Sequence, residues 1–237
     1  MPSTDLAARI DHTALKPETT LSDVLRLADE ALQHAFAAVC VNPRFAEPLA
    51  AKLDASRTPR VLTCAVAGFP LGASHPVVMA IEATHACKAG AREIDVVAHL
   101  PHLFKKDAEA LKEDLLHTTR AVRAVSGAIV VKVILETAAL RAHADATGGG
   151  LAEFEAMIEA GCLAAAQAGC DFVKTSTGFH GAGGATIEAV QLLRKHAGKM
   201  KVKASGGIRT RDDAMKMIDA GADRLGTSSG IAIVTGS

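Results

Sequence analysis

Two lysines at the ends of consecutive apolar runs are the residues of this chain best suited to covalent chemistry. Lys174 ends one run and precedes a small, hydroxyl-rich loop that finishes at Gly178, and Lys203 ends the next run, just before Gly207. A lysine attacks a carbonyl only as the neutral amine, and with a free value near ~10.4 only about one in 2,500 is neutral at pH 7. A neighbouring cation favours the neutral form. The pattern predicts Lys174 as a reactive amine tuned by Lys203; exposed or phosphate-binding lysines are the alternative.

A carboxylate accompanies the two lysines. Asp95 lies in the apolar run Glu93–Val97, and an unpaired carboxylate in such a run is strongly destabilising. Beside two lysines it could carry protons for a carbinolamine as that intermediate loses water. The alternative is a plain salt bridge that only positions Lys203, and both interpretations stay open at this point.

Glycine-rich turns predict a phosphate site. Gly207 follows the second lysine, and the run Gly226–Gly230 contains Ser228 and Ser229. Backbone amides and hydroxyls in such turns hold a phosphate without needing net charge. Gly178 could extend this cradle. Ordinary tight turns are the alternative.

Other chemistries find little support. His99 and His102 are three residues apart without a visible third ligand, and the five cysteines include no C-x-x-C pair, so no metal is predicted. An odd number of cysteines indicates a reduced, cytoplasmic chain. Cys40 by itself is more typical of a small buried residue than of a nucleophile. Nucleotide-binding and serine-hydrolase motifs are missing, and no cofactor is predicted.

The elements that must position these residues alternate along the chain. Eight short, apolar runs are predicted as strands, and amphipathic helical patterns separate them, the first opening on a Thr20–Asp23 capping box. Continuous Val/Ile/Leu runs are typical of strands buried on both faces. The predicted strands are His12–Leu15, Ala37–Val41, Val61–Ala67, Glu93–Val97, Ile129–Leu135, Phe172–Thr175, Lys201–Ala204 and Arg224–Gly226.

Eight strand–helix units in 237 residues predict an α/β protein, a single-domain (β/α)8 TIM barrel over 1–237 with a short N-terminal extension. A doubly wound sheet would usually carry a glycine loop after its first strand, and Asp11–Lys16 contains no glycine. In a barrel the loops after the strands form the active end, which would gather the lysines and Asp95. Arg141–Gly150 is expected to be an irregular surface insertion.

Composition narrows the class of protein. Apolar residues make up 49% of the chain, and 26 basic residues balance 26 acidic ones, which indicates a folded domain with a large core. Tryptophan and tyrosine are absent and no basic stripe is visible, so nucleic acid is not an expected partner. No apolar run is long enough to cross a membrane, and no signal segment is recognisable.

The chain closely resembles the deoxyribose-phosphate aldolase family. The segments that carry the resemblance follow the family order along nearly the whole chain: Ile10–Thr13 with Leu15–Pro17, Val39–Pro43, Gly68–Gly72, Glu93–Asp95, Lys132–Ile134 with Glu136–Thr137, Asp171–Gly178, Lys203–Thr210 and Gly226–Gly230.

The resemblance implies a metal-free class I aldolase of the cytoplasm. Such an enzyme reversibly cleaves 2-deoxy-D-ribose 5-phosphate to D-glyceraldehyde 3-phosphate and acetaldehyde. By resemblance Lys174 forms the Schiff base, Lys203 favours its neutral form, and Asp95 is the acid/base partner. Further residues are implied in binding the sugar (Asp11, Thr13, Cys40 and Lys132) and the phosphate (Gly178, Gly207, Gly226, Ser228 and Ser229). Phosphosugar and aldehyde substrates are the implied partners, with a homodimer as the possible assembly.

Some positions depart from the family pattern. His99 stands where Asn or a small residue is expected, and Phe179 where some members place a phosphate-contacting lysine. Some members use a C-terminal tyrosine in proton transfer, and this chain has none. Two other functions compete: a phosphate-binding barrel isomerase or synthase without a covalent lysine, and a non-catalytic phosphosugar-binding barrel.

Overall fold

The eight strands close into a parallel barrel in a computed structural model that describes residues 3–56 and 61–236. Each strand pairs with its sequence neighbour, and β8 pairs with β1. The predicted (β/α)8 fold is confirmed, with strand ends within two residues of the prediction. The strands are β1 (Ile10–Ala14), β2 (Ala38–Val41), β3 (Leu62–Ala67), β4 (Glu93–Val97), β5 (Val130–Ile134), β6 (Phe172–Lys174), β7 (Lys201–Ser205) and β8 (Arg224–Thr227).

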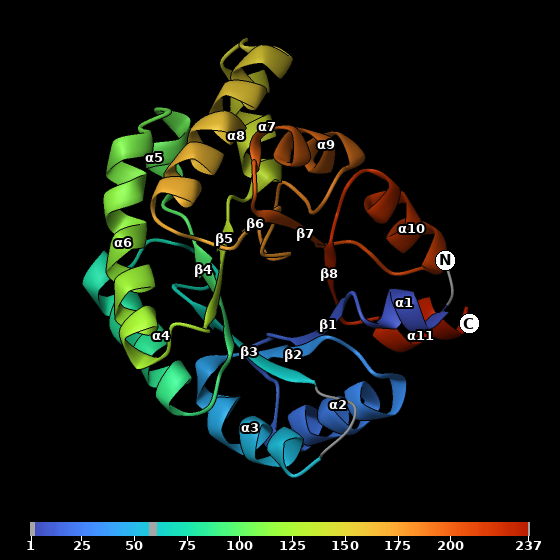
Figure 1. Ribbon diagram of the computed structural model, residues 1–237. Helices are drawn as coiled ribbons and strands as arrows, with labels where there is room; N and C mark the ends of the chain where they lie inside the picture. The colour runs from blue at the N-terminus through green and yellow to red at the C-terminus, as the bar shows by residue number, and fades with distance from the viewer. Residues whose placement is uncertain (1–2, 57–60, 237) are drawn as a thin grey trace.

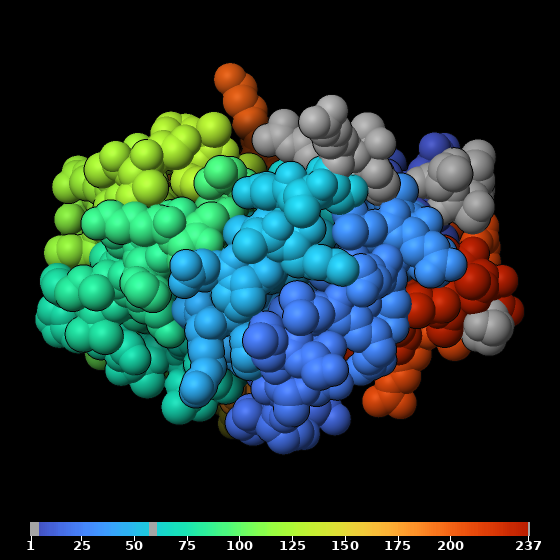
Figure 2. Space-filling view, turned by 90° about the horizontal axis from the view of Figure 1, so that it is seen from below, coloured from blue at the N-terminus to red at the C-terminus, as the bar shows by residue number. Residues whose placement is uncertain are grey.

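Helices form an outer ring around the barrel (Figure 1). Helix α1 (Ser3–Ala7) precedes β1 and lies beside the last helix, so the two described ends of the chain meet. The other helices are α2 (Leu21–His34), α3 (Ala46–Asp54), α4 (Pro76–Lys88), α5 (Leu100–Phe104), α6 (Ala108–Val125), α7 (Thr137–Ala146), α8 (Gly150–Gln167), α9 (Ile187–His196), α10 (Arg211–Asp219) and α11 (Gly230–Thr235), with a 3-10 turn at Pro43–Phe45. Figure 2 shows one flank of the molecule, on which the helices of the first half of the chain lie side by side, from green α4 to blue α2.

Local sequence signals set the ends of several helices. Thr20 with Asp23 forms the predicted capping box of α2, and Thr210 with Asp213 forms another at α10. Each threonine hydroxyl accepts the aspartate amide while the aspartate accepts the threonine amide, which satisfies two otherwise unpaired donors. Gly90, in the turn between α4 and β4, has a φ of 107°, a conformation that glycine adopts without steric strain.

The stretch Arg141–Gly150 corrects the prediction of an irregular insertion. Residues up to Ala146 belong to α7, and α8 begins at Gly150. Arg141 binds Asp145 one turn later, and Leu140 and Ala144 are buried. Because alanine, leucine and arginine favour helix, the segment forms a helix whose end is marked by the three glycines.

The inner wall of the barrel divides into an apolar and a charged part. Ala38 and Cys40 of β2 pack on Cys64 and Val66 of β3 inside the barrel, whereas Val39 joins the large core that includes residues of the outer helices. The inward residues of the remaining strands are largely charged or polar. In the described residues, no helix has the length and apolar content that spanning a membrane requires.

Candidate active site

Strand register brings the two predicted lysines together. Lys174 ends β6 and pairs in register with Lys203 of β7, and Asp95 of β4 pairs with Lys132 of β5. Residues in register on neighbouring strands point to the same side of a sheet, which here is the barrel interior. Four residues distant in sequence therefore converge on one small volume.

Asp95 is the centre of this cluster. Its Oδ2 accepts hydrogen bonds from Lys174 Nζ at 2.7 Å and from Lys203 Nζ at 2.8 Å. Its Oδ1 accepts from Lys132 Nζ at 2.8 Å and from Cys64 Sγ at 3.3 Å. Burial alone would raise the pKa of Asp95, but the three lysines outweigh it and hold that pKa well below its usual range. Asp95 is therefore a firmly ionised carboxylate.

Two further carboxylates complete the cluster. Asp11 Oδ2 lies 2.5 Å from Lys203 Nζ, and Asp11 Oδ1 lies 2.6 Å from Arg224 Nη1. Glu93 Oε2 contacts Lys132 Nζ at 2.6 Å, and Arg224 reaches Glu93 at 3.4 Å. Burial acts to raise the pKa of Asp11, but Lys203 and Arg224 hold it below its usual range.

A charge count singles out Lys174. The cluster holds four cationic side chains and three carboxylates: Lys132, Lys174, Lys203 and Arg224 against Asp11, Glu93 and Asp95. Burial by itself would lower the pKa of Lys132 and of Lys203, yet neighbouring carboxylates raise both above the usual value. Lys174 contacts only Asp95 among the described acids. Deprotonating Lys174 therefore leaves the cluster neutral, and no other single deprotonation breaks so few ion pairs.

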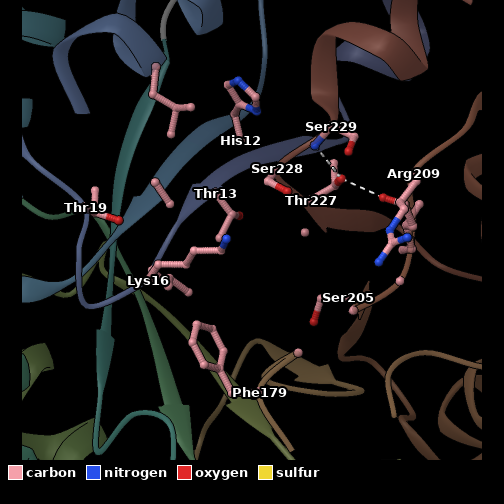
Figure 3. Close-up of a pocket in the computed structure, with 18 of the residues that line it drawn as sticks. His12, Thr13, Lys16, Thr19, Phe179, Ser205, Arg209, Thr227, Ser228 and Ser229 are labelled. Atoms are coloured by element: carbon pink, nitrogen blue, oxygen red, sulfur yellow. Dashed lines mark hydrogen bonds between the residues drawn. The ribbon is translucent and has the colours of Figure 1, made fainter. Parts of the chain in front are cut away.

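Lys174 also has access to substrate. It forms part of the floor of a cavity of about 1070 Å³ at the barrel mouth, although its side chain is only 3% exposed. Thr13, Ser205 and the β8 loop contribute polar groups to the cavity wall, and Phe179 contributes an apolar ring (Figure 3). A buried amine that opens onto a polar cavity is suited to condense with a bound carbonyl compound.

Basic side chains and glycine turns give the cavity an anion-binding character. Lys16 and Arg209 direct their nitrogens into it from different sides (Figure 3). Gly206 and Gly207 have φ values of 91° and 83°, and consecutive turns of this kind present backbone amides to an anion. The β8 loop is fixed by Thr227, whose hydroxyl donates to Ile208 O at 2.7 Å and accepts from Ser229 N at 2.9 Å.

The predicted residues fall into three groups. Seven line the cavity: Thr13, Lys174, Gly178, Gly207, Gly226, Ser228 and Ser229. Four lie buried directly beneath it in the charged cluster: Asp11, Asp95, Lys132 and Lys203. Cys40 does not line the cavity and packs with Cys64; a hydrogen bond from Cys64 lowers the pKa of the Cys40 thiol.

Sequence reasoning gave no role to four residues that the structure brings to the site. Glu93 and Arg224 are cluster members. The sequence feature that could have indicated them is a charged residue within each of two apolar strands. Lys16 and Arg209 line the cavity; both stand inside segments that the resemblance had already marked. Lys16 follows β1 by two residues, in the loop at the mouth of the barrel.

Glu136 is a buried residue that fixes the loop after Lys174. Its carboxylate accepts the backbone amide of Thr177 at 3.2 Å and also binds the Thr177 hydroxyl. Burial raises the pKa of Glu136. Its backbone has a φ of 54°, an uncommon conformation for a residue with a side chain. The strain is consistent with a positioning role at the mouth of the barrel.

Two departures from the family pattern have distinct environments. His99 precedes α5, with Nδ1 3.1 Å from Gly72 O, and is not among the residues lining the cavity. Phe179 does line the cavity and packs edge-on against Phe69, with ring centroids 5.1 Å apart. Phe179 therefore supplies an apolar wall and no charge.

Known proteins resemble this chain along nearly its whole length. The profile of the DeoC/LacD family aldolases matches residues 6–236. A deoxyribose-phosphate aldolase of Listeria innocua is 45% identical over 232 residues, covering 98% of this chain and 95% of the relative. One from Halalkalibacterium halodurans is 46% identical over 235 residues, covering 99% and 96%. The structure of the tetrameric deoxyribose phosphate aldolase of Aeropyrum pernix superposes with a TM-score of 0.85 at 33% identity, covering 98% and 91%. This chain belongs to the DeoC/LacD family of aldolases.

Proposed function

We propose that this chain reversibly cleaves 2-deoxy-D-ribose 5-phosphate to D-glyceraldehyde 3-phosphate and acetaldehyde through a Schiff base on Lys174. The observation that carries the proposal is the buried Lys174 amine at the cavity floor, sharing one oxygen of Asp95 with the charged Lys203. The relatives named deoxyribose-phosphate aldolase support the choice of substrate. No feature of the described site favours a barrel isomerase or a silent binding protein.

The proposed steps follow from the contacts. The neutral Lys174 amine attacks the aldehyde carbon, and Asp95, 2.7 Å away, passes the proton released from nitrogen to the carbonyl oxygen, which becomes a hydroxyl. A second proton, taken up from solvent, lets that hydroxyl leave as water. The resulting iminium withdraws electrons, so the bond between carbons 2 and 3 breaks as the C3 hydroxyl loses its proton. Glyceraldehyde 3-phosphate leaves, the remaining enamine is protonated at carbon, and water releases acetaldehyde. Lys203 stays charged throughout because two carboxylates hold it.

We propose that the phosphate of the substrate binds at the glycine-rich side of the cavity. Gly178, Gly207, Ser228 and Ser229 line that side, and Arg209 points into it. Binding there fixes the aldehyde over Lys174 by holding the far end of the molecule. Asp11, Cys40 and Lys132 lie beneath the floor, so their proposed effect on the sugar passes through the residues above them.

A direct assay tests the proposal. Purified protein incubated with 2-deoxy-D-ribose 5-phosphate is expected to release glyceraldehyde 3-phosphate and acetaldehyde in equal amounts, with unphosphorylated 2-deoxy-D-ribose as a poorer substrate. Interconversion of the phosphosugar without release of acetaldehyde would identify an isomerase instead.

Loss of the cavity cations is expected to weaken phosphate binding. Lys16→Met and Arg209→Gln should each raise KM for the phosphorylated substrate by about 10- to 100-fold, the range for a hydrogen bond to a charged group. Neither change should alter KM for 2-deoxy-D-ribose by a comparable factor. Lys88→Met, on the exposed face of α4, is the matched control. Equal losses on both sugars would show that these residues do not bind the phosphate.

Removal of the neighbouring cation is expected to shift the pH dependence. In Lys203→Leu the ammonium form of Lys174 is no longer repelled, so trapping of the acetaldehyde Schiff base with borohydride should begin about 1–3 pH units higher. Lys201→Leu, an exposed position of the same strand, controls for a general change of β7. An unchanged onset in a folded Lys203→Leu protein would exclude Lys203 as the tuning charge.

The assembly and location expected from the sequence stay predictions. The relative from Aeropyrum pernix is a tetramer, and a homodimer is proposed for this chain. Sedimentation of the purified protein distinguishes a monomer, a dimer and a tetramer.

A further inference from the structure

A buried carboxylate lies directly behind the loop that follows Lys174. Glu136 is 2% exposed and stands between β5 and α7. Backbone hydrogen bonds fix the chain on both sides of it. Leu135 N donates to Lys174 O at 3.0 Å, and Thr137 N donates to Thr175 O at 2.8 Å. These bonds hold Glu136 in its uncommon backbone conformation, with a φ of 54°, so its carboxylate stays beside the residues that follow the reactive amine.

Thr177 connects this carboxylate to the cavity. Thr177 lines the cavity together with Lys174, and its hydroxyl donates a hydrogen bond to Glu136 Oε2. The same hydroxyl oxygen accepts the backbone amide of Phe179 at 3.1 Å. Glu136 Oε1 and Oε2 lie 3.3 and 3.2 Å from Thr177 N. One carboxylate oxygen can therefore accept the amide while the other gives a proton to the hydroxyl or takes one from it.

We propose that Thr177 and Glu136 carry the proton between the C3 hydroxyl and carbon 2 of the substrate, an assignment that rests on the proposed aldol cleavage. As the bond between carbons 2 and 3 breaks, the C3 hydroxyl gives its proton to Thr177 Oγ1, and the Thr177 hydroxyl proton passes to Glu136 Oε2. The electron pair of the C3 O–H bond forms the carbonyl of the leaving aldehyde. The pair of the broken carbon–carbon bond forms the C=C bond of the enamine, and the iminium nitrogen becomes neutral.

The same two side chains then return the proton. Protonated Glu136 donates to Thr177 Oγ1, which also accepts from Phe179 N, so the Thr177 O–H is free to turn toward the cavity. The C=C pair of the enamine takes the Thr177 proton at carbon 2, the Glu136 proton replaces it on Oγ1, and the nitrogen lone pair re-forms the iminium. The proton removed from oxygen has moved to carbon, and these two steps consume no proton from solvent.

Burial suits Glu136 to this exchange better than Asp95. Burial raises the pKa of Glu136, which brings its acid and base forms closer in population near neutral pH, as general acid–base catalysis requires. Three lysines hold the pKa of Asp95 well below its usual range, and Asp95 is not among the residues that line the cavity. Asp95 therefore serves the nitrogen of Lys174, 2.7 Å away, and a different group serves the carbon.

Deuterium exchange into acetaldehyde measures the proton transfer at carbon without the phosphosugar. Acetaldehyde forms an iminium on Lys174, and its methyl proton is removed and returned through the same two side chains. In D₂O the native protein should therefore replace the methyl protons by deuterium, as followed by NMR. Glu136→Gln should slow this exchange by about 10²- to 10⁴-fold, the range for loss of a general acid or base. Borohydride should still trap acetaldehyde on Lys174 in this variant, because Asp95 and Lys203 are unchanged.

Three further variants separate proton transfer from support of the loop. Thr177→Val removes the hydroxyl with little change of shape and should slow the exchange to a similar extent, whereas Thr177→Ser should restore most of the rate. Glu82→Gln is the matched control, because the Glu82 carboxylate also accepts a loop amide, that of Gly68 at 2.8 Å, and does not line the cavity. Its exchange rate should equal that of the native protein.

The outcomes distinguish this assignment from the proposed function. A native protein that forms no borohydride adduct overturns both. An adduct without methyl exchange in the native protein, or exchange at the native rate in folded Glu136→Gln or Thr177→Val, overturns the assignment alone. Equal losses of trapping and exchange would show that Glu136 only holds the loop, which also overturns it. Circular dichroism verifies folding, and if Glu136→Gln does not fold, Thr177→Val with its serine counterpart decides.

Discussion

Replacing Lys174 by alanine is expected to abolish cleavage of 2-deoxy-D-ribose 5-phosphate, with kcat lower by about 10⁴- to 10⁶-fold, the scale for removing a covalent nucleophile. No other described residue can take over its role, because the remaining cluster cations each contact at least two carboxylates. The measurement is mass spectrometry after incubation with acetaldehyde and borohydride. The native protein should gain a two-carbon adduct at Lys174, and the variant none.

The controls for this experiment come from the same cluster. Lys174→Ala removes the one cation that exceeds the carboxylates, so the protein should remain folded with a thermal midpoint close to the native one. Exposed Lys201 should remain unlabelled in both proteins at neutral pH, where an ordinary lysine is charged. Labelling that survives in Lys174→Ala, or cleavage at the native rate, would falsify the covalent mechanism.

Asp95→Asn is expected to reduce both stability and activity strongly. The substitution leaves Lys132, Lys174 and Lys203 without the carboxylate that contacts all three. Breaking a buried ion pair from one side typically costs about 3–5 kcal/mol of unfolding free energy. Loss of a proton carrier lowers kcat by about 10²- to 10⁴-fold. Urea unfolding and the cleavage assay measure the two effects separately.

A double variant decides whether Asp95 carries protons or only pairs charges. Asp95→Asn with Lys132→Met removes one buried cation together with the carboxylate and so restores the native excess of one cation. Stability should then recover by several kcal/mol, because fewer charges remain unpaired, while kcat should stay low. Recovery of kcat together with stability would instead assign Asp95 a purely structural role.

The barrel itself was predictable because its signals are local. Apolar runs and the capping box at Thr20 each act within a few residues, and the repeated alternation of apolar runs with helical patterns predicted eight strands. The prediction that Arg141–Gly150 is irregular was wrong, because the alanines, Leu140 and Arg141 before the three glycines favour helix. Where local signals agree, the order of strands in a barrel follows from the chain order.

The pairing of Lys174 with Lys203 was predictable for the same reason. Consecutive parallel strands are neighbours, so residues at corresponding strand ends must meet. The sequence also marked Asp95 as a carboxylate that needed a partner inside an apolar strand. These three residues and the glycine turns are thus recognisable in the sequence by their types and by their places at strand ends.

Only the tertiary structure decided which charges meet across the barrel. Arg224 of β8 donates a hydrogen bond to Asp11 of β1, 213 residues away in sequence. Cys64 of β3 contacts Asp95 of β4. Such contacts depend on barrel closure and on side-chain rotamers, which no local pattern encodes. The sequence by itself determined that a lysine at a strand end has a neighbouring cation. Closure of the barrel brought three carboxylates to the four cations, which leaves Lys174 as the cation in excess. The physical reason is that a buried charge is strongly destabilising unless it is paired.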